Sequence, residues 1–305
     1  MKSARSAAGR RARMATVVAI GDPVAVAVAS PVPASGRAAS RWKRQLGSWA
    51  IPEEILQAAP VSPWGFPPEL FTRAAAAALS DAEPTPSRAA ALEALTTGGS
   101  VLDVGAGGGA ASLPLAPPAG LLVAVDESQA MLSSFAEGAA RRGTRHAEVA
   151  GRWPDVATAA PAADVVVCHH VLYNVADLTP FLQALTDHAC RRVVVELTER
   201  HPLSGLAPLW LAIHRLERPS RPTASDAVDV VRELGYDVHV TRFAHRSLWD
   251  SAPLEERVAF ARRQLCVGPE HDAEIAGFFE AAGSDTRREL VTLWWDPGAP
   301  ARPGP

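Results

Sequence analysis

Short apolar runs alternate with segments of helical periodicity from residue 100 onward, and this alternation constrains the fold most strongly. Two of the runs, "LLVAV" at 121–125 and "DVVVC" at 164–168, are continuous, as in strands that are buried on both faces. The pattern predicts a parallel sheet with helices on both faces. The predicted strands are 100–104, 121–126, 145–150, 163–169, 191–197, 236–243 and 289–296. The predicted helices between them are 108–116, 128–142, 177–188, 205–217 and 224–234.

Two further helical regions lie outside this pattern. The first, 45–96, contains a helix at about 69–80 and another that begins at about Ser87, a suitable N-cap. The second, at about 250–284, contains two helices before the last strand. The predicted fold class is therefore α/β, with a doubly wound, mostly parallel seven-stranded sheet. An N-terminal helical cap at 45–96 precedes the main domain, 97–297, and a helical insertion precedes its last strand.

Charge is distributed unevenly along the 305 residues. Residues 1–44 hold nine Lys or Arg and one acidic residue, net +8, whereas the remainder holds 21 basic and 32 acidic residues, net −11. We interpret 1–44 as a disordered basic tail, with Met1 or Met14 as its start and an export signal as the alternative, and 298–305 as a second tail. The acidic remainder argues against nucleic acid as a partner.

Composition also bears on compartment and metal content. No stretch approaches the roughly 20 apolar residues that a membrane-spanning helix needs, so no membrane partner is predicted. The three cysteines, Cys168, Cys190 and Cys266, are scattered and lack CxxC spacing. This favours a reducing compartment and argues against a thiolate metal site. We predict a cytoplasmic protein without a metal; the oligomeric state stays open.

A glycine-rich segment, "VLDVGAGGGA" at 101–110, follows the first predicted strand. Without Cβ atoms its backbone can approach a ligand closely, and a following helix would supply N–H groups. The spacing Gly105-x-Gly107-x-x-Ala110 also satisfies a dinucleotide fingerprint, which is weak by itself. Asp126 ends the second strand about 20 residues later and is suited to ribose hydroxyls. Asp103 is unusual beside a pyrophosphate and suits a ligand with a cationic end.

The segments "VLDVGAGGG", "VAVDES" and "ADVVVCHHVLYNVADL" resemble three motifs of the Rossmann-like methyltransferases that use S-adenosyl-L-methionine. The resemblance covers about 98–200. It implies that the loop of Gly105, Ala106 and Gly107 lies against the methionine moiety of the cofactor. It further implies that Asp103 helps to hold the amino group. The ribose is then bound by Asp126 together with the adjoining Glu127. Turn-cap and helix-cap roles for Asp103 and Asp126 are the structural alternatives.

The adenine contact departs from the family pattern. After the third strand the family carries a Gly-Asp pair, whereas this chain has Gly151 followed by Arg152. Adenine would then be held by backbone groups at these residues and by stacking on Trp153. An ordinary core tryptophan is the alternative for Trp153.

The end of the fourth strand carries the candidate catalytic residues. The resemblance implies that His169 lines the cofactor, and that His170 or Tyr173 binds the methyl acceptor or removes its proton. A structural role for His170 and Tyr173 is the alternative. Because adjacent strand residues point to opposite faces, His169 and His170 do not predict a shared metal.

The fifth strand is followed by three further polar candidates, Glu196, Glu199 and His201. They lie where open α/β folds bind ligands. A carboxylate there is a possible base or acceptor clamp, and a solvated loop charge is the alternative.

The predicted function is methyl transfer from S-adenosyl-L-methionine to a small-molecule acceptor. The Asn/Asp-Pro-Pro-Tyr segment of base-amine methyltransferases is absent from strand four. Three alternatives stay open: an RNA or protein methyltransferase, an NAD(P)-dependent oxidoreductase, and a non-catalytic cofactor-binding protein. We expect the N-terminal helices and the inserted pair to form a lid that selects the acceptor. Its apolar side chains include Trp49, Trp64, Phe66, Phe260 and Phe278.

Overall fold

The computed structural model describes residues 36–64, 68–80, 84–246, 252–281 and 287–298. Within these ranges seven strands form one sheet. They are β1 (Ser100–Val104), β2 (Leu121–Asp126), β3 (Arg145–Ala150), β4 (Ala163–His169), β5 (Ala189–Thr198), β6 (His239–Arg246) and β7 (Arg287–Trp295). Each strand coincides with a predicted one to within a few residues at either end.

The order of the strands is β3-β2-β1-β4-β5-β7-β6. Strands β3, β2, β1, β4 and β5 are parallel, and β7 runs antiparallel to both β5 and β6. This confirms the predicted α/β class with a mostly parallel sheet. The chain runs outward from β1 to β2 and β3. It then returns to β4, which pairs with the other side of β1. The carboxyl ends of β1 and β4 therefore flank the point where the strand order reverses, which is where open α/β sheets bind ligands.

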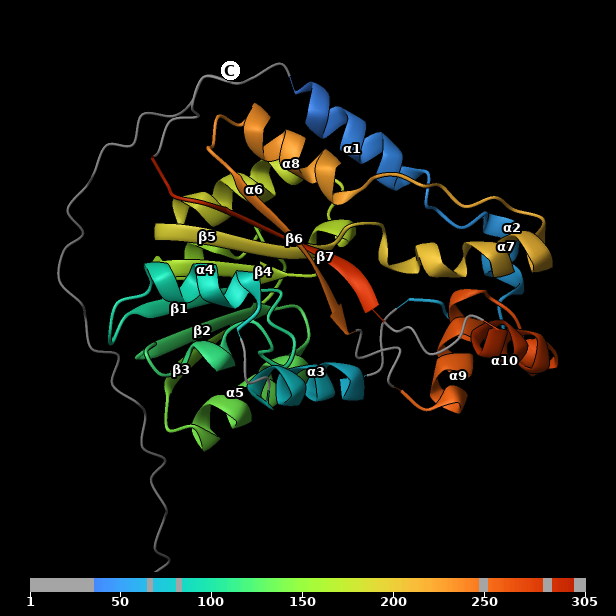
Figure 1. The fold of residues 1–305 in the computed structure, drawn as a ribbon, viewed down its shortest axis with the longest axis horizontal. Coiled ribbons are helices and arrows are strands. Elements are labelled where there is room, and N and C mark those ends of the chain that lie inside the picture. Colours follow the sequence, from blue (N-terminus) through green and yellow to red (C-terminus); the bar gives the residue numbers. More distant parts are fainter. Residues whose placement is uncertain (1–35, 65–67, 81–83, 247–251, 282–286, 299–305) are drawn as a thin grey trace, which may run out of the picture. The chain divides into compact units, whose positions relative to one another are not determined.

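Helices cover both faces of the sheet (Figure 1). One face is covered by α1 (Arg37–Gly47), α6 (Leu178–Asp187) and α8 (Ala224–Glu233). The other is covered by α3 (Pro68–Ser80), α4 (Pro86–Ala94) and α5 (Gln129–Arg141). Short 3-10 helices are η1 (Leu113–Leu115), η2 (Ala157–Ala159), η3 (Leu172–Asn174), η4 (Pro202–Leu206) and η5 (Pro269–His271).

A separate small core joins α2 (Glu53–Ala58), α7 (Ala207–His214), α9 (Leu254–Gln264) and α10 (Asp272–Ala281). These helices lie together beyond one end of the sheet (Figure 1). Because α7 follows β5 and α9 follows β6, this end is the one where the parallel strands finish. The inserted pair is present as predicted, but the region 45–96 does not form a single cap. Its helices are divided between this small core and one face of the sheet.

The helix predicted over 108–116 does not form. The chain there makes consecutive turns and the single 3-10 turn η1. Pro114, Pro117 and Pro118 lack the N–H group that a continuing helix needs, which explains the difference. The start of α4 also differs, because its N-cap is Thr85, whose hydroxyl accepts from the N–H of Arg88 at 3.3 Å.

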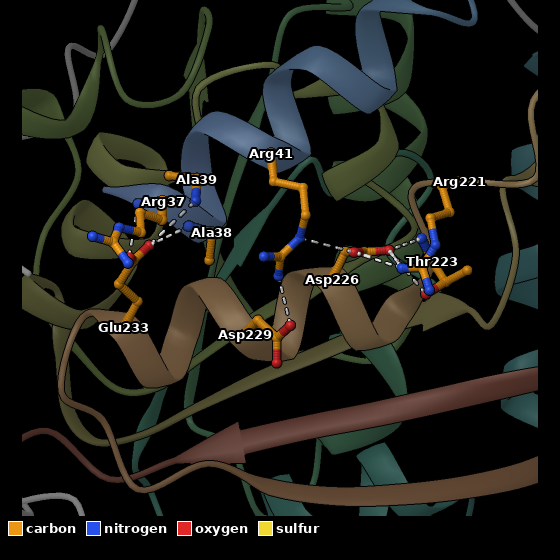
Figure 2. Close-up of polar contacts among 9 residues, drawn as sticks. All are labelled: Arg37, Ala38, Ala39, Arg41, Arg221, Thr223, Asp226, Asp229 and Glu233. Atoms are coloured by element: carbon orange, nitrogen blue, oxygen red, sulfur yellow. Dashed lines mark hydrogen bonds and ion pairs between the residues drawn. The ribbon is translucent and has the colours of Figure 1, made fainter. Parts of the chain in front are cut away.

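Helix α1 crosses the predicted tail boundary at residue 44, so that boundary is wrong: ordered structure begins by Arg37. The carboxylate of Glu233 in α8 accepts from the first N–H groups of α1, those of Arg37, Ala38 and Ala39, at 2.8, 2.7 and 3.3 Å (Figure 2). A carboxylate at this position satisfies unpaired donors and complements the helix dipole.

The middle of α1 is also fastened to α8. Arg41 contacts Asp229 at 2.6 Å and Asp226 at 3.4 Å (Figure 2). Asp226 is almost fully buried and also accepts from Arg221 and from the N–H of Thr223, so its charge is well compensated. Trp42 is 0% exposed, and its indole N–H donates to the carbonyl of Val175 at 2.8 Å. Helix α1 thus supports the loop that follows β4.

Replacing Trp42 with alanine removes a buried ring and this hydrogen bond. We expect the free energy of unfolding to fall by about 3–5 kcal/mol, measured by urea denaturation. The control is Lys43→Ala, an exposed neighbour on the same helix, which should change the value by less than about 0.5 kcal/mol. Equally small effects of both substitutions would show that α1 contributes little to the fold.

Candidate functional site

The glycine loop follows β1 directly and is held against β2. The N–H groups of Gly105 and Ala106 donate to the carbonyl of Val125 at 2.8 and 3.1 Å. Gly105, Gly107 and Gly109 all have positive φ, at 72°, 52° and 85°, where a side chain is strained. A Cβ atom on Gly105 would lie 2.4 Å from Cγ2 of Val171. The loop after β4 therefore packs directly on the glycine loop.

Asp103 lies in β1 with its side chain 1% exposed. Its Oδ2 accepts from the hydroxyl of Ser112 at 2.5 Å, while its Oδ1 is buried without a hydrogen-bond partner. Burial raises the pKa of Asp103 to about 7, even though the hydrogen bond from Ser112 acts in the opposite direction. A buried carboxylate with one unsatisfied oxygen is suited to a ligand that brings its own positive charge.

Asp126 ends β2 and closes the same loop. Its Oδ2 accepts from the N–H of Gly107 at 2.9 Å, and its Oδ1 accepts from the N–H of Ser128 at 2.8 Å. Ser128, rather than Asp126, is the N-cap of α5. Both carboxylate oxygens are fixed in direction and keep further lone pairs for a ligand.

The segment after β3 departs from the predicted adenine contact. Gly151 donates its N–H to the carbonyl of Asp126 at 2.9 Å, which brings it beside the end of β2. Arg152 and Glu127 are both exposed and form a 3.4 Å ion pair. Trp153 is 7% exposed within the core, and its ring meets His188 edge-on at 4.9 Å. It is an ordinary core tryptophan, so the predicted stacking on adenine does not fit its position.

His169 and His170, at the end of β4, differ in the burial of their side chains. The Nε2 atom of His169 is buried without a partner, and burial lowers the pKa of this residue. His170 has a side chain 49% exposed, at the edge of the sheet. Its φ is +60°, an uncommon value for a residue with a side chain, although histidine adopts it more often than most.

Tyr173 is a structural residue in this arrangement. Its hydroxyl donates to the carbonyl of Thr198 at 2.9 Å and lies 3.3 Å from that of Glu199. The ring is 6% exposed and stacks against Trp42. Burial also raises the pKa of Tyr173, which opposes proton transfer. These contacts do not fit the predicted catalytic role and leave His170 as the candidate.

A row of polar side chains crosses three neighbouring strands at this edge. Strand pairing aligns His169 in β4, Glu196 in β5 and Thr292 in β7. The side chain of Glu196 is covered by α4, where Ser87 donates a 2.5 Å hydrogen bond to it. Glu196 is a candidate from the sequence alone. The contact of Ser87 with it is not predicted, because a serine so close to the start of a helix also fits an N-cap.

The other two candidates after β5 have structural contacts. Glu199 pairs with Arg242 at 2.9 Å, and His201 stacks on Trp49 with ring centroids 3.8 Å apart. Burial, with a smaller effect of the charge of Arg218, lowers the pKa of His201 to about 4. Neither residue joins the row at the sheet edge.

The side chains predicted for a lid are placed in several environments. Trp49 and Phe260 are buried, and Phe278 packs partly against the small core of α2, α7, α9 and α10. Trp64 is 64% exposed. Phe66 lies outside the described residues.

The described residues hold neither a metal-binding cluster nor a membrane-spanning helix. No group of three or more His, Cys, Asp or Glu side chains in these ranges is arranged to hold a metal ion. None of the helices in the described part of the chain is long and apolar enough to cross a membrane.

The sheet order and the glycine loop at its switch point define a Rossmann-like cofactor-binding domain. Residues 102–194, which hold the loop, Asp126 and the end of β4, match the family model described as a methyltransferase domain. This segment of the chain is therefore similar to methyltransferase domains. No curated protein sequence matches the chain.

Solved structures with a similar fold include YjhP from E. coli, at 17% identity and a TM-score of 0.47, which covers 77% of this chain and 100% of that one. Magnesium protoporphyrin IX methyltransferase from Synechocystis, solved with bound S-adenosylhomocysteine, is 15% identical, covers 83% and 92%, and has a TM-score of 0.44. YcgJ from Bacillus subtilis is 12% identical, covers 76% and 99%, and also scores 0.44.

The raised pKa of Asp103 predicts a pH-dependent stability. The folded protein keeps this proton up to about pH 7, whereas the unfolded chain releases it near pH 4. Wild-type stability therefore falls as the pH rises from about 4 to about 7 and stays low above that range. Asp103→Asn lacks this cost, so we expect it to be more stable at pH 8 by as much as about 4 kcal/mol.

Urea unfolding of both proteins at pH 5 and pH 8 measures the effect. The advantage of the variant should be larger at pH 8. Asp155→Asn, at an exposed carboxylate, is the control and should show no comparable change. An advantage that is independent of pH would contradict the burial of an ionisable Asp103.

Proposed function

We propose that the chain transfers a methyl group from S-adenosyl-L-methionine to a small-molecule acceptor. The observation that carries this proposal is Asp103, a buried carboxylate with an unpartnered oxygen beside the glycine loop. The methionine end of the cofactor carries an ammonium group that could satisfy this oxygen. A pyrophosphate would instead meet like charge there, so an NAD(P)-dependent oxidoreductase is the weaker alternative.

The other cofactor contacts follow from the same geometry. Gly105, Ala106 and Gly107 would lie against the methionine moiety, because side chains there would fill the approach. The carboxylate of Asp126 would accept from the ribose hydroxyls while it keeps its two backbone donors. Gly151, next to the end of β2, would meet the adenine through its backbone. His169 would line the cofactor with its unpartnered ring nitrogen.

Methyl transfer does not require the protein to activate the methyl donor. The bound sulfonium makes its methyl group electrophilic already. The residues of this chain would position the acceptor in line with that group and exclude water. His170 lies at the end of β4, and the next residue, Val171, packs on the glycine loop. His170 would accept a proton from the acceptor.

A small acceptor is favoured by the surroundings of this edge. The small core of α2, α7, α9 and α10 lies beyond the ends of the parallel strands and is largely apolar. An apolar core at this place would cover a small-molecule site, whereas RNA would call for an open basic groove. A protein substrate and a non-catalytic binding role remain the other candidates. The cytoplasmic location stays a prediction.

Calorimetric titration tests the cofactor directly. We expect S-adenosylhomocysteine to bind and NADH not to bind, because Asp103 complements an ammonium group. NADH binding with no measurable S-adenosylhomocysteine binding would overturn the proposal.

Asp126→Ala tests the ribose contact. It should weaken S-adenosylhomocysteine binding by about 1–3 kcal/mol, since charge-assisted hydrogen bonds are lost. Glu137→Ala, at an exposed position of α5, should leave affinity unchanged. A circular dichroism melt of each variant separates lost affinity from lost fold. Unchanged affinity in Asp126→Ala would leave this residue with its backbone contacts alone.

A further inference from the structure

Glu196 is a buried charged residue to which the proposed function gives no task. The residue is 6% exposed at the carboxyl end of β5. Glutamate is almost never buried without partners. Here each oxygen has one: Oε2 accepts from the hydroxyl of Ser87 at 2.5 Å, and Oε1 lies 3.3 Å from Nε2 of His170.

The partners keep Glu196 ionised. Burial alone would raise the pKa of its carboxyl, but the neighbouring histidines and the hydroxyl of Ser87 lower it to about 2. Among the lowering causes the charge of His169 comes first, followed by His170 and the hydroxyl of Ser87. A negative charge therefore faces the ring of His170 at neutral pH.

His170 is held by Glu196 at two points. Its backbone N–H donates to the carbonyl of Glu196 at 2.7 Å, and its ring nitrogen Nε2 faces the carboxylate of the same residue. Since a carboxylate only accepts, a neutral ring in this pair would carry its hydrogen on Nε2, and Nδ1 would keep its lone pair. The ring is half exposed and its backbone is in the left-handed region, a strained conformation that functional sites often keep.

The pair lies beside the glycine loop. Val171 follows His170 in the chain, and its Cγ2 occupies the space where a Cβ of Gly105 would be. Strand β4 borders β1 at the switch point of the sheet, and β5 borders β4 on the other side. The methyl donor and the imidazole would therefore meet at one edge.

We propose that Glu196 is a positioning residue that holds His170 as a proton acceptor, and that the methyl acceptor is a hydroxyl group. This inference rests on the proposed methyl transfer. The acceptor oxygen forms a bond to the methyl carbon with a lone pair, and the carbon–sulfur bond breaks with its electron pair left on sulfur. The O–H bond breaks, its electrons stay on oxygen, and its proton passes to Nδ1 of His170. The positive charge of the sulfonium thus ends on the imidazolium.

The first step of the test identifies the product. The full-length protein is incubated with trideuteromethyl S-adenosyl-L-methionine and a small-molecule extract of cells that encode it. Mass spectrometry then locates the label. We expect a methyl ether, which requires loss of a hydroxyl proton. A labelled methyl ester, quaternary amine or sulfonium would overturn the inference alone, because a carboxylate, a tertiary amine or a thioether loses no proton when it is methylated. No labelled product at all would overturn the proposed function and this inference with it.

The second step is a double-mutant cycle with that product as readout. Glu196→Gln keeps the shape and removes the charge. His170→Asn removes the proton acceptor and tolerates the left-handed backbone. We expect each to lower kcat by about 100-fold or more with little change in KM. The double variant should be no slower than His170→Asn, because the two residues act as one unit.

Three controls keep the result specific. Glu93→Gln, at an exposed glutamate of α4, should retain wild-type kcat. Glu196→Asp should recover part of the activity lost in Glu196→Gln. The affinity of each variant for S-adenosylhomocysteine should stay within about twofold of wild type. Additive losses in the double variant, wild-type turnover in Glu196→Gln, or loss of its S-adenosylhomocysteine binding would each overturn the positioning role.

Discussion

The parallel pairing of β1 with β2 on one side and β4 on the other is the constraint on which the site depends. It makes the strand order reverse beside β1, so the loops after β1 and β4 leave the sheet in opposite directions. The glycine loop and the loop that begins at His170 are therefore neighbours although more than sixty residues separate them. The two loops are in direct contact where Val171 packs against Gly105. Any ligand of the glycine loop then lies within reach of β4.

Local signals in the sequence predict the parts of the site that depend on strand ends. Continuous apolar runs locate the buried strands, and Asp103 and Asp126 follow from their places in them. The helix predicted after the glycine loop fails because Pro114 and its neighbours override the apolar periodicity. Trp153 was ambiguous in the sequence because a strand-end tryptophan can stack on a ligand or fill a core, and only packing decides which.

Contacts distant in sequence explain the remaining differences. The sequence places most of helix α1 in the predicted tail, because its basic residues resemble a solvated segment. Its order instead comes from Glu233 at its N-terminus and from Trp42 beneath it, partners that lie far along the chain. No local pattern carries that information. The same holds for Ser87, whose buried hydroxyl meets Glu196 across 109 positions. Helix starts are read from sequence, but what a side chain on the first turn faces is decided by tertiary packing.

The two buried carboxylates on this sheet illustrate how environment divides their tasks. Asp103 has one hydrogen-bond donor and a free oxygen, and burial raises its pKa to about 7. Glu196 has a partner at each oxygen, and the charge of His169 together with these partners outweighs burial, so its pKa is about 2. A carboxylate that the protein leaves unsatisfied is completed by a cationic ligand, whereas one that the protein satisfies fully can only orient its neighbour. Pairs of acids separated in this way commonly mark distinct roles within one site. On this basis we propose that Asp103 serves the cofactor and Glu196 the proton acceptor.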